Sequence, residues 1–184
     1  MCAYNIYLGV ALSVVLLSAS VIQVQGGDER VLKLRKFEKI QQDEKAIQSS
    51  LSISEPDAED HRTISGELKT LLTIDNEWKV NITVLRKDSS EKDYSMFKDV
   101  PIMGACELMD TYYRRFFYDT LKDYSNAPHP DNCPLAPTEL QIKDYPLNAS
   151  MLKKLLTPGF YLLNGQVLKD DEIKIMYMAE LQVE

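Results

Sequence analysis

An alternation of apolar and polar residues constrains the fold of this chain more than any other feature of its sequence. Residues 173–184 present an apolar set on one side, and the residues between them form a second, mostly polar set. The apolar set is Ile173, Ile175, Tyr177, Ala179, Leu181 and Val183, and the other set is Lys174, Met176, Met178, Glu180, Gln182 and Glu184. Because successive side chains of a β-strand point to opposite faces, the pattern predicts a strand with one buried face.

Further segments share this period of two. Trp78, Val80, Ile82 and Val84 alternate with polar residues, which predicts an inward-facing apolar row. The segment Phe160–Leu163 is followed by Asn164-Gly165 and then by Lys169-Asp170-Asp171, a pattern that predicts a strand that turns and returns as the final one. Weaker strand patterns occupy Val31–Ile40, Ser49–Ser54, Thr63–Ile74 and Leu140–Tyr145. So many short strands between polar turns predict an antiparallel β-sandwich or cup.

One segment departs from this period. From Ala105 to Leu121 the apolar residues recur at helical spacing, with charged residues around them. The following segment, Ser125–Asn132, is rich in proline and asparagine, which favours an irregular loop. The sequence therefore predicts a mainly β domain that carries one helix.

The N-terminus holds an uncharged, largely apolar stretch from Ile6 to Ile22. It could be a transmembrane anchor or the core of a secretory signal peptide. We favour a signal peptide over residues 1–26, because small residues follow the apolar core and Val24-Gln25-Gly26 resembles a cleavage site. Residues 27–184 would then form a single secreted, extracellular domain, without a transmembrane segment after cleavage.

Cysteine usage agrees with export. Cys2 would leave with the signal peptide, so Cys106 and Cys133 remain as an even pair, and a disulfide between them is the natural inference. The alternatives are a catalytic thiol, for which His61 and His129 offer no convincing base, and a metal site, whose ligand spacing is not matched. Two glycosylation sequons begin at Asn81 and Asn148, and Asn81 falls on the polar face of its strand.

The charged residues argue against several classes of function. A net charge of −7 disfavours binding to a phosphate backbone, so we expect no nucleic-acid partner. Acidic residues lie together in turns, as in Asp170-Asp171, where solvated side chains are a better interpretation than an acid/base pair. The sequence contains no glycine-rich phosphate loop and no nucleophile elbow. We therefore expect no enzymatic activity, cofactor or metal.

Aromatic residues are concentrated between Tyr112 and Tyr124. Ordinary core packing is the simpler interpretation, and the alternative is that some of these rings line a cavity for an apolar ligand between two sheets. The candidate ligand-binding residues are Trp78, Val80, Ile82, Val84, Met109, Tyr113, Phe116, Phe117, Phe160, Ile175 and Tyr177.

The order of several short motifs resembles one known family. The motifs are Ile64-Ser65-Gly66-Glu67, the strand from Trp78 to Val84 with its sequon, a helix with Cys106 and Tyr112-Tyr113, Ser125-Asn126 with Pro128, Cys133-Pro134, and Leu155 to Pro158-Gly159-Phe160-Tyr161. From about Phe37 onward the chain resembles the CheB-type insect secreted proteins, which are similar to the ganglioside-activator branch of the ML lipid-recognition superfamily.

The resemblance implies a two-sheet, immunoglobulin-like β-cup with a lipid-accommodating interior and, in some members, a link to chemosensory detection of hydrophobic cues. It also implies that Cys106 and Cys133 form the family's disulfide; ganglioside-activator proteins have several disulfides, so cavity shape is not transferred. The leading expectation is a secreted, glycosylated, non-enzymatic carrier of a lipid or other hydrophobic small molecule, with a membrane receptor as a further partner. The alternative is an extracellular protein-interaction module with a dry core, such as a receptor accessory or innate-recognition protein.

Overall fold

The computed structural model describes residues 31–57, 62–147 and 156–184. The expected signal peptide, His61 and the sequon at Asn148 lie outside the described residues. The elements are β1 (Leu32–Gln42), β2 (Ile47–Ser49), β3 (Ser52–Ile53), β4 (Thr63–Thr70), β5 (Lys79–Lys87), β6 (Ser95–Asp99), β7 (Met103–Gly104), α1 (Ala105–Leu108), η1 (Met109–Phe117), α2 (Tyr118–Leu121), β8 (Thr138–Pro146), β9 (Gly159–Lys169) and β10 (Glu172–Val183).

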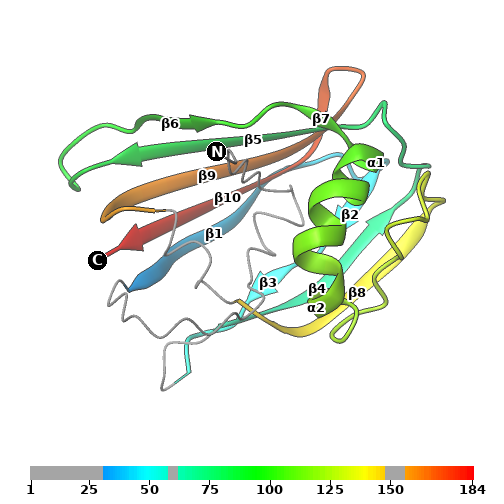
Figure 1. Ribbon diagram of the computed structural model, residues 1–184, viewed down its shortest axis with the longest axis horizontal. Coiled ribbons are helices and arrows are strands. Elements are labelled where there is room, and N and C mark those ends of the chain that lie inside the picture. The colour runs from blue at the N-terminus through cyan, green and yellow to red at the C-terminus, as the bar shows by residue number, and fades with distance from the viewer. Residues whose placement is uncertain (1–30, 58–61, 148–155) are drawn as a thin grey trace, which may run out of the picture.

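Two antiparallel sheets pack as a sandwich, with one helical segment beside them (Figure 1). The larger sheet has the order β1-β10-β9-β5-β6, and the short β7 also pairs with β5. The smaller sheet has β4 at its centre, with β2 and β3 along one edge and β8 along the other. The expected mainly β sandwich with one helix is thereby confirmed.

The final strand lies inside the larger sheet, between β1 and β9. Ile175, Tyr177 and Ala179 are buried, as the alternation predicts. The turn that precedes β10 is Asp170-Asp171, and both residues have positive φ, as a two-residue hairpin turn of the primed type requires. Asn164-Gly165 makes no turn, because both residues pair with β10 and β5 within β9.

The smaller sheet is more irregular than the sequence predicts. The segment expected as one strand from Ser49 to Ser54 divides between β2 and β3, which pair with different parts of β4. The division occurs opposite Gly66, whose φ is +132° and where an added Cβ would lie 2.5 Å from the carbonyl oxygen of Ser50. Glycine therefore permits the close approach that lets two short strands follow β4.

The helical segment runs unbroken from α1 through η1 to α2, in agreement with the prediction for residues 105–121. Its central part, η1, is a π-helix: the backbone N–H of Tyr118 donates to the carbonyl oxygen of Tyr113, five residues earlier. Apolar spacing alone does not distinguish this wider turn from an α-helix. Within the described ranges, no helix combines the length and apolar character needed to span a membrane.

Candidate ligand-binding cavity

A cavity of about 160 Å³ lies where the helical segment meets both sheets. Its walls come from β2, β4 and β8 of the smaller sheet, from β5, β9 and β10 of the larger sheet, and from α1 and η1. The lining residues are Ile47, Leu68, Thr70, Ile74, Val80, Ala105, Leu108, Met109, Tyr113, Phe117, Pro128, Leu135, Thr138, Leu140, Val167 and Ile175. No charged side chain is among them.

Three residues of η1 give the cavity its helical wall. Met109, Tyr113 and Phe117 follow each other at intervals of four, so they lie on one face of the helical segment, and all three are buried. The polar residues of η1 lie between them in sequence and are exposed, as Arg114 and Arg115 illustrate. The apolar stripe of the helical segment therefore faces the cavity.

The loop after the helix closes part of the cavity and is attached to the helix by a hydrogen bond and a disulfide. The hydroxyl of Tyr113 donates to the carbonyl oxygen of Pro128 at 2.7 Å. Cys106 and Cys133 form a disulfide with their Cα atoms 5.5 Å apart, which confirms the predicted pairing. The start of the helix and the far end of the loop are thus covalently joined.

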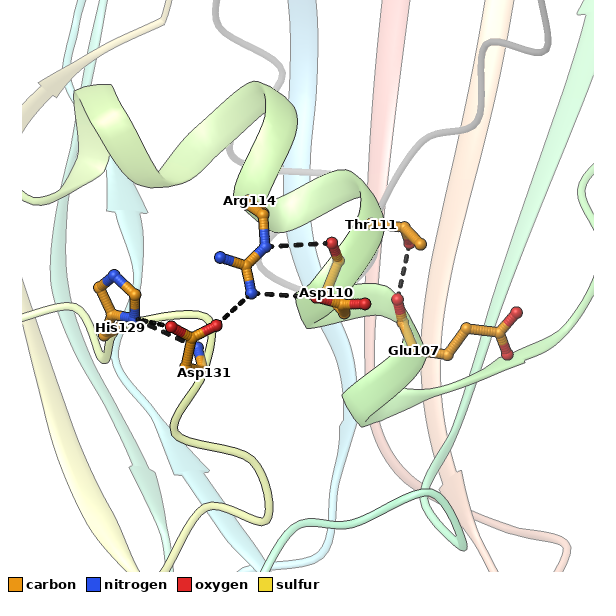
Figure 2. A network of polar contacts seen from close by, with 6 residues as sticks. All are labelled: Glu107, Asp110, Thr111, Arg114, His129 and Asp131. Carbon is orange, nitrogen blue, oxygen red and sulfur yellow. Dashed lines mark hydrogen bonds and ion pairs between the residues drawn. The ribbon is translucent and has the colours of Figure 1, made fainter.

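A group of charged residues joins the same helix and loop on the outside (Figure 2). Arg114 pairs with Asp110 one turn earlier, at 2.9 Å, and with Asp131 of the loop. Nδ1 of His129 lies 3.3 Å from a carboxylate oxygen of Asp131. The hydrogen bond from Arg114 holds the pKa of Asp131 below its ordinary value, so this carboxylate stays ionised at neutral pH.

Two polar side chains at the cavity wall, Tyr113 and Thr70, have hydrogen-bond partners within the protein. Burial raises the pKa of Tyr113, so its phenol stays neutral and donates to Pro128. The hydroxyl of Thr70 accepts a hydrogen bond from the backbone N–H of Thr138 at 3.1 Å. A ligand here would meet an apolar surface without a charge to neutralise, which suits an uncharged, apolar molecule.

The structure brings five of the candidate residues to this cavity, namely Val80, Met109, Tyr113, Phe117 and Ile175. Four others, Trp78, Ile82, Val84 and Tyr177, are buried in the core but are not part of the cavity lining. Strand alternation predicts which side chains point inward, but it does not predict where along the sandwich the interior is left empty.

The last two candidates lie elsewhere. Phe160 follows buried Gly159 and precedes buried Tyr161, so it is on the other face of β9, with the ammonium of Lys87 5.7 Å from its ring. Phe116 is half-buried, and its ring stacks on that of Tyr112, 6.4 Å away between centroids. Neither ring lines the cavity.

Sequence reasoning missed the wall that the smaller sheet provides. Leu68 and Leu140 lie opposite each other on paired strands β4 and β8. Ile74 and Leu135 pair through two backbone hydrogen bonds of 2.9 Å, outside the named strands. The alternation of Leu140 and Ile142 was visible in the sequence, but the isolated bridge of two loops carries no comparable periodic signal.

Asn81 lies on the outer face of β5, opposite Gln166, and its side-chain amide donates to that residue at 3.2 Å. Its side chain is half-buried, between the buried neighbours Val80 and Ile82. The structure therefore places this asparagine on the face away from the cavity. Among the described residues, no group of three or more histidine, cysteine, aspartate or glutamate side chains could hold a metal ion.

Part of the chain is similar to a known protein family. Residues 80–163 match a family described as Protein of unknown function (DUF1091). The match covers most of β5, the helical segment, the disulfide, β8 and the first part of β9, which together supply much of the cavity wall. No curated protein matches the chain significantly. The similarity to CheB-type and ML proteins therefore stays a prediction.

Proposed function

We propose that this domain is a secreted, non-enzymatic binder of an apolar small molecule, or of the apolar part of a lipid, in the cavity beneath the helical segment. The cavity and its uncharged lining carry the proposal. The disulfide adds support for the secretory part, because such bonds persist in oxidising compartments.

The size of the cavity sets the scale of the ligand. A volume of about 160 Å³ is comparable to engineered apolar cavities of roughly 150 Å³, which stay dry and bind benzene. It corresponds to about five water volumes, and about five buried methylenes at about 0.8 kcal/mol each contribute about 4 kcal/mol. That free energy corresponds to a dissociation constant of about 1 mM before the costs of binding.

A ligand longer than this needs more room than the cavity offers. The helical segment is the wall that can provide it, because it belongs to neither sheet and its neighbouring loop is irregular. We therefore expect a long acyl chain to bind only with outward displacement of η1, against the restraint of the disulfide and of the bond from Tyr113 to Pro128.

A cavity-filling substitution tests the proposal. Val167 lines the cavity and pairs with Val80 and Ile175 on its two neighbouring strands. We expect toluene to shift NMR signals of cavity residues in the wild-type protein. Val167→Phe should remove most of the free volume and abolish these shifts. We expect its free energy of unfolding to stay within about 3 kcal/mol of that of the wild type.

The matched control is Leu168→Phe, because Leu168 is the next residue of the same strand and is not part of the cavity lining. This variant should bind toluene as the wild type does. Native mass spectrometry of protein secreted by insect cells would show whether an apolar ligand is retained. Protein that is empty in this measurement and gives no toluene shifts would contradict the proposal and favour the interaction module with a dry core.

A further inference from the structure

A second concave surface, which we call the edge groove, lies between β1 and β3 and is separate from the cavity. Its volume is about 310 Å³, and its lining residues are Leu34, Arg35, Lys36, Phe37, Lys39, Leu51, Ser52, Ile53 and Arg62. It shares no lining residue with the cavity beneath the helix. Because β1 ends the order of the larger sheet and β3 pairs with β4, the groove lies along the edges of both sheets.

An irregularity in β1 gives the groove its apolar side. The register of β1 against β10 shifts between Leu34 and Lys36 and again between Lys39 and Gln41. Because of the first shift, Leu34 and Phe37 both lie opposite inward-facing residues of β10, although they are three positions apart. The ring of Phe37 stacks on that of Tyr177, with the centroids 5.1 Å apart.

The groove also carries cations. Lys39 lies opposite Tyr177, and its ammonium donates to the carbonyl oxygen of Ser49 at 2.6 Å and to the side chain of Gln42 at 2.8 Å. Arg62 donates to the carbonyl oxygen of Ser54 at 3.2 Å. These partners are uncharged, and within the described ranges neither cation forms a salt bridge to a carboxylate.

The two outer cations are engaged differently. Lys36 forms an ion pair with Glu38 at 2.6 Å. The partner of Arg35, Gln182 at 2.8 Å, is uncharged, but it lies between buried Leu181 and Val183 and therefore on the outer face of β10. Lys39 and Arg62 are therefore the cations best placed to receive an anion from the groove. The chain has a net charge of −7, so two cations beside apolar side chains stand out on its surface. They favour the binding of a partly apolar molecule that carries a negative charge.

We propose that the edge groove binds a dissolved amphipathic anion, with its carboxylate paired to Lys39 or to Arg62 and a short apolar body against Leu34, Phe37 and Ile53. The site is independent of the cavity, which is uncharged and suits neutral molecules. An extended acidic peptide and an anionic membrane surface are the other occupants that the experiment must separate from it.

Titration with octanoate, followed by NMR, tests the inference. Octanoate should shift the amide signals of residues 34–39 and 51–53, whereas octanol, which lacks the charge, and acetate, which lacks the apolar body, should bind at least tenfold more weakly. Binding should also weaken as salt is raised from 0.05 to about 0.5 M, because both cations are near solvent. Octanol binding as tightly as octanoate would overturn the proposal.

The variant Lys39→Gln with Arg62→Gln should weaken octanoate binding at least tenfold, since one charge-assisted hydrogen bond accounts for about that factor. The matched control is Lys92→Gln with Lys122→Gln, which removes the same charge outside the groove and should bind as the wild type does. Equal affinity of the two double variants would overturn the proposal. Circular dichroism of both would establish that they are folded.

Two further measurements distinguish octanoate in the edge groove from octanoate in the cavity and from a different occupant of the groove. Val167→Phe, which fills the cavity, should leave octanoate binding unchanged; loss of binding would assign octanoate to the cavity and overturn the groove proposal. Vesicles of phosphatidylglycerol or a poly-glutamate peptide that bind this groove while octanoate does not would also overturn it. If toluene does not bind but octanoate behaves as described, the proposed function of the cavity is contradicted and the edge-groove proposal is supported.

Discussion

At the scale of single residues, a side chain's face and its partners decide what a substitution does. Tyr177 is fully buried, stacks on Phe37 and forms a hydroxyl hydrogen bond with Ser49. Its neighbour Met178 is half-buried on the other face of β10. The two positions therefore test the register of the strand with the same substitution.

Tyr177→Asp should destabilise the domain by more than about 4 kcal/mol and prevent secretion, because it buries a charge without a partner. Met178→Asp should change the free energy of unfolding by less than about 1 kcal/mol and be secreted. Immunoblots of culture medium and cell lysate would measure how much of each variant is secreted. Secretion of both variants at the wild-type level would show that the inner face of β10 is misassigned.

Lys174 shows what a local sequence pattern does not predict about a single residue. Alternation places it on the polar side of the last strand, which would make it a simple surface residue. In the structure its ammonium lies 3.1 Å from Asp43 and 2.7 Å from Glu172, and its side chain is 13% exposed. Asp43 lies 131 positions away in the chain, so no local pattern could identify this ion pair.

At the scale of elements, the helical segment and its loop are attached by one covalent bond and several weak interactions. Removing the disulfide with Cys106→Ser and Cys133→Ser should lower the free energy of unfolding by about 3–4 kcal/mol, because the bond closes a loop of 27 residues. Urea unfolding followed by circular dichroism would measure the change. The double variant should also bind toluene with altered kinetics, since the wall of the cavity is less restrained.

The matched comparison is Arg114→Gln, which removes the exposed ion pairs between the same helix and loop. Salt bridges at exposed positions contribute little, so the unfolding midpoint of this variant should stay near that of the wild type at neutral pH. A larger loss from Arg114→Gln than from the cysteine substitutions would contradict this order of contributions.

Elements with strong periodicity were predictable from the sequence, and their irregular parts were not. The strands around Trp78 and Tyr177 and the helix over 105–121 follow from spacing alone. The π-helical turns of η1, the division between β2 and β3, and the bulges of β1 have no periodic pattern in the sequence that predicts them. The cavity and the edge groove are formed at these irregular places, so the candidate residues from the sequence described only part of the sites.

At the scale of the whole molecule, pH should limit stability from both sides. Hydrogen bonds from Lys174, Arg114 and Lys33 lower the pKa values of Asp43, Asp131 and Glu184. Their stabilising effect is present above the ordinary values of 3.8 and 4.5 and is lost as pH falls through the lower values of the folded state. Burial raises the pKa values of Tyr113 and Tyr177 above the ordinary value of 10.0. The stability that their neutral phenols contribute is therefore present below pH 10.0 and is lost as pH rises above it.

Free energies of unfolding from urea titrations should therefore be highest between about pH 5 and pH 9 and should decline outside that range. The variant Tyr113→Phe should lose part of the alkaline decline and keep the acid one. A flat profile from pH 9 to about pH 11 would show that the two tyrosines ionise as freely in the folded protein as in the unfolded chain.

The position of β10 has a consequence for biosynthesis. Of the described strands it leaves the ribosome last, yet it occupies the place between β1 and β9 in the larger sheet. Until then β1 has no partner in that sheet, so its apolar residues stay unpaired in the nascent chain until the strands from β2 to β9 have been synthesised. A premature stop between β9 and β10 would thus leave the edges of β1 and β9 exposed and give a polypeptide prone to aggregation and degradation in the cell.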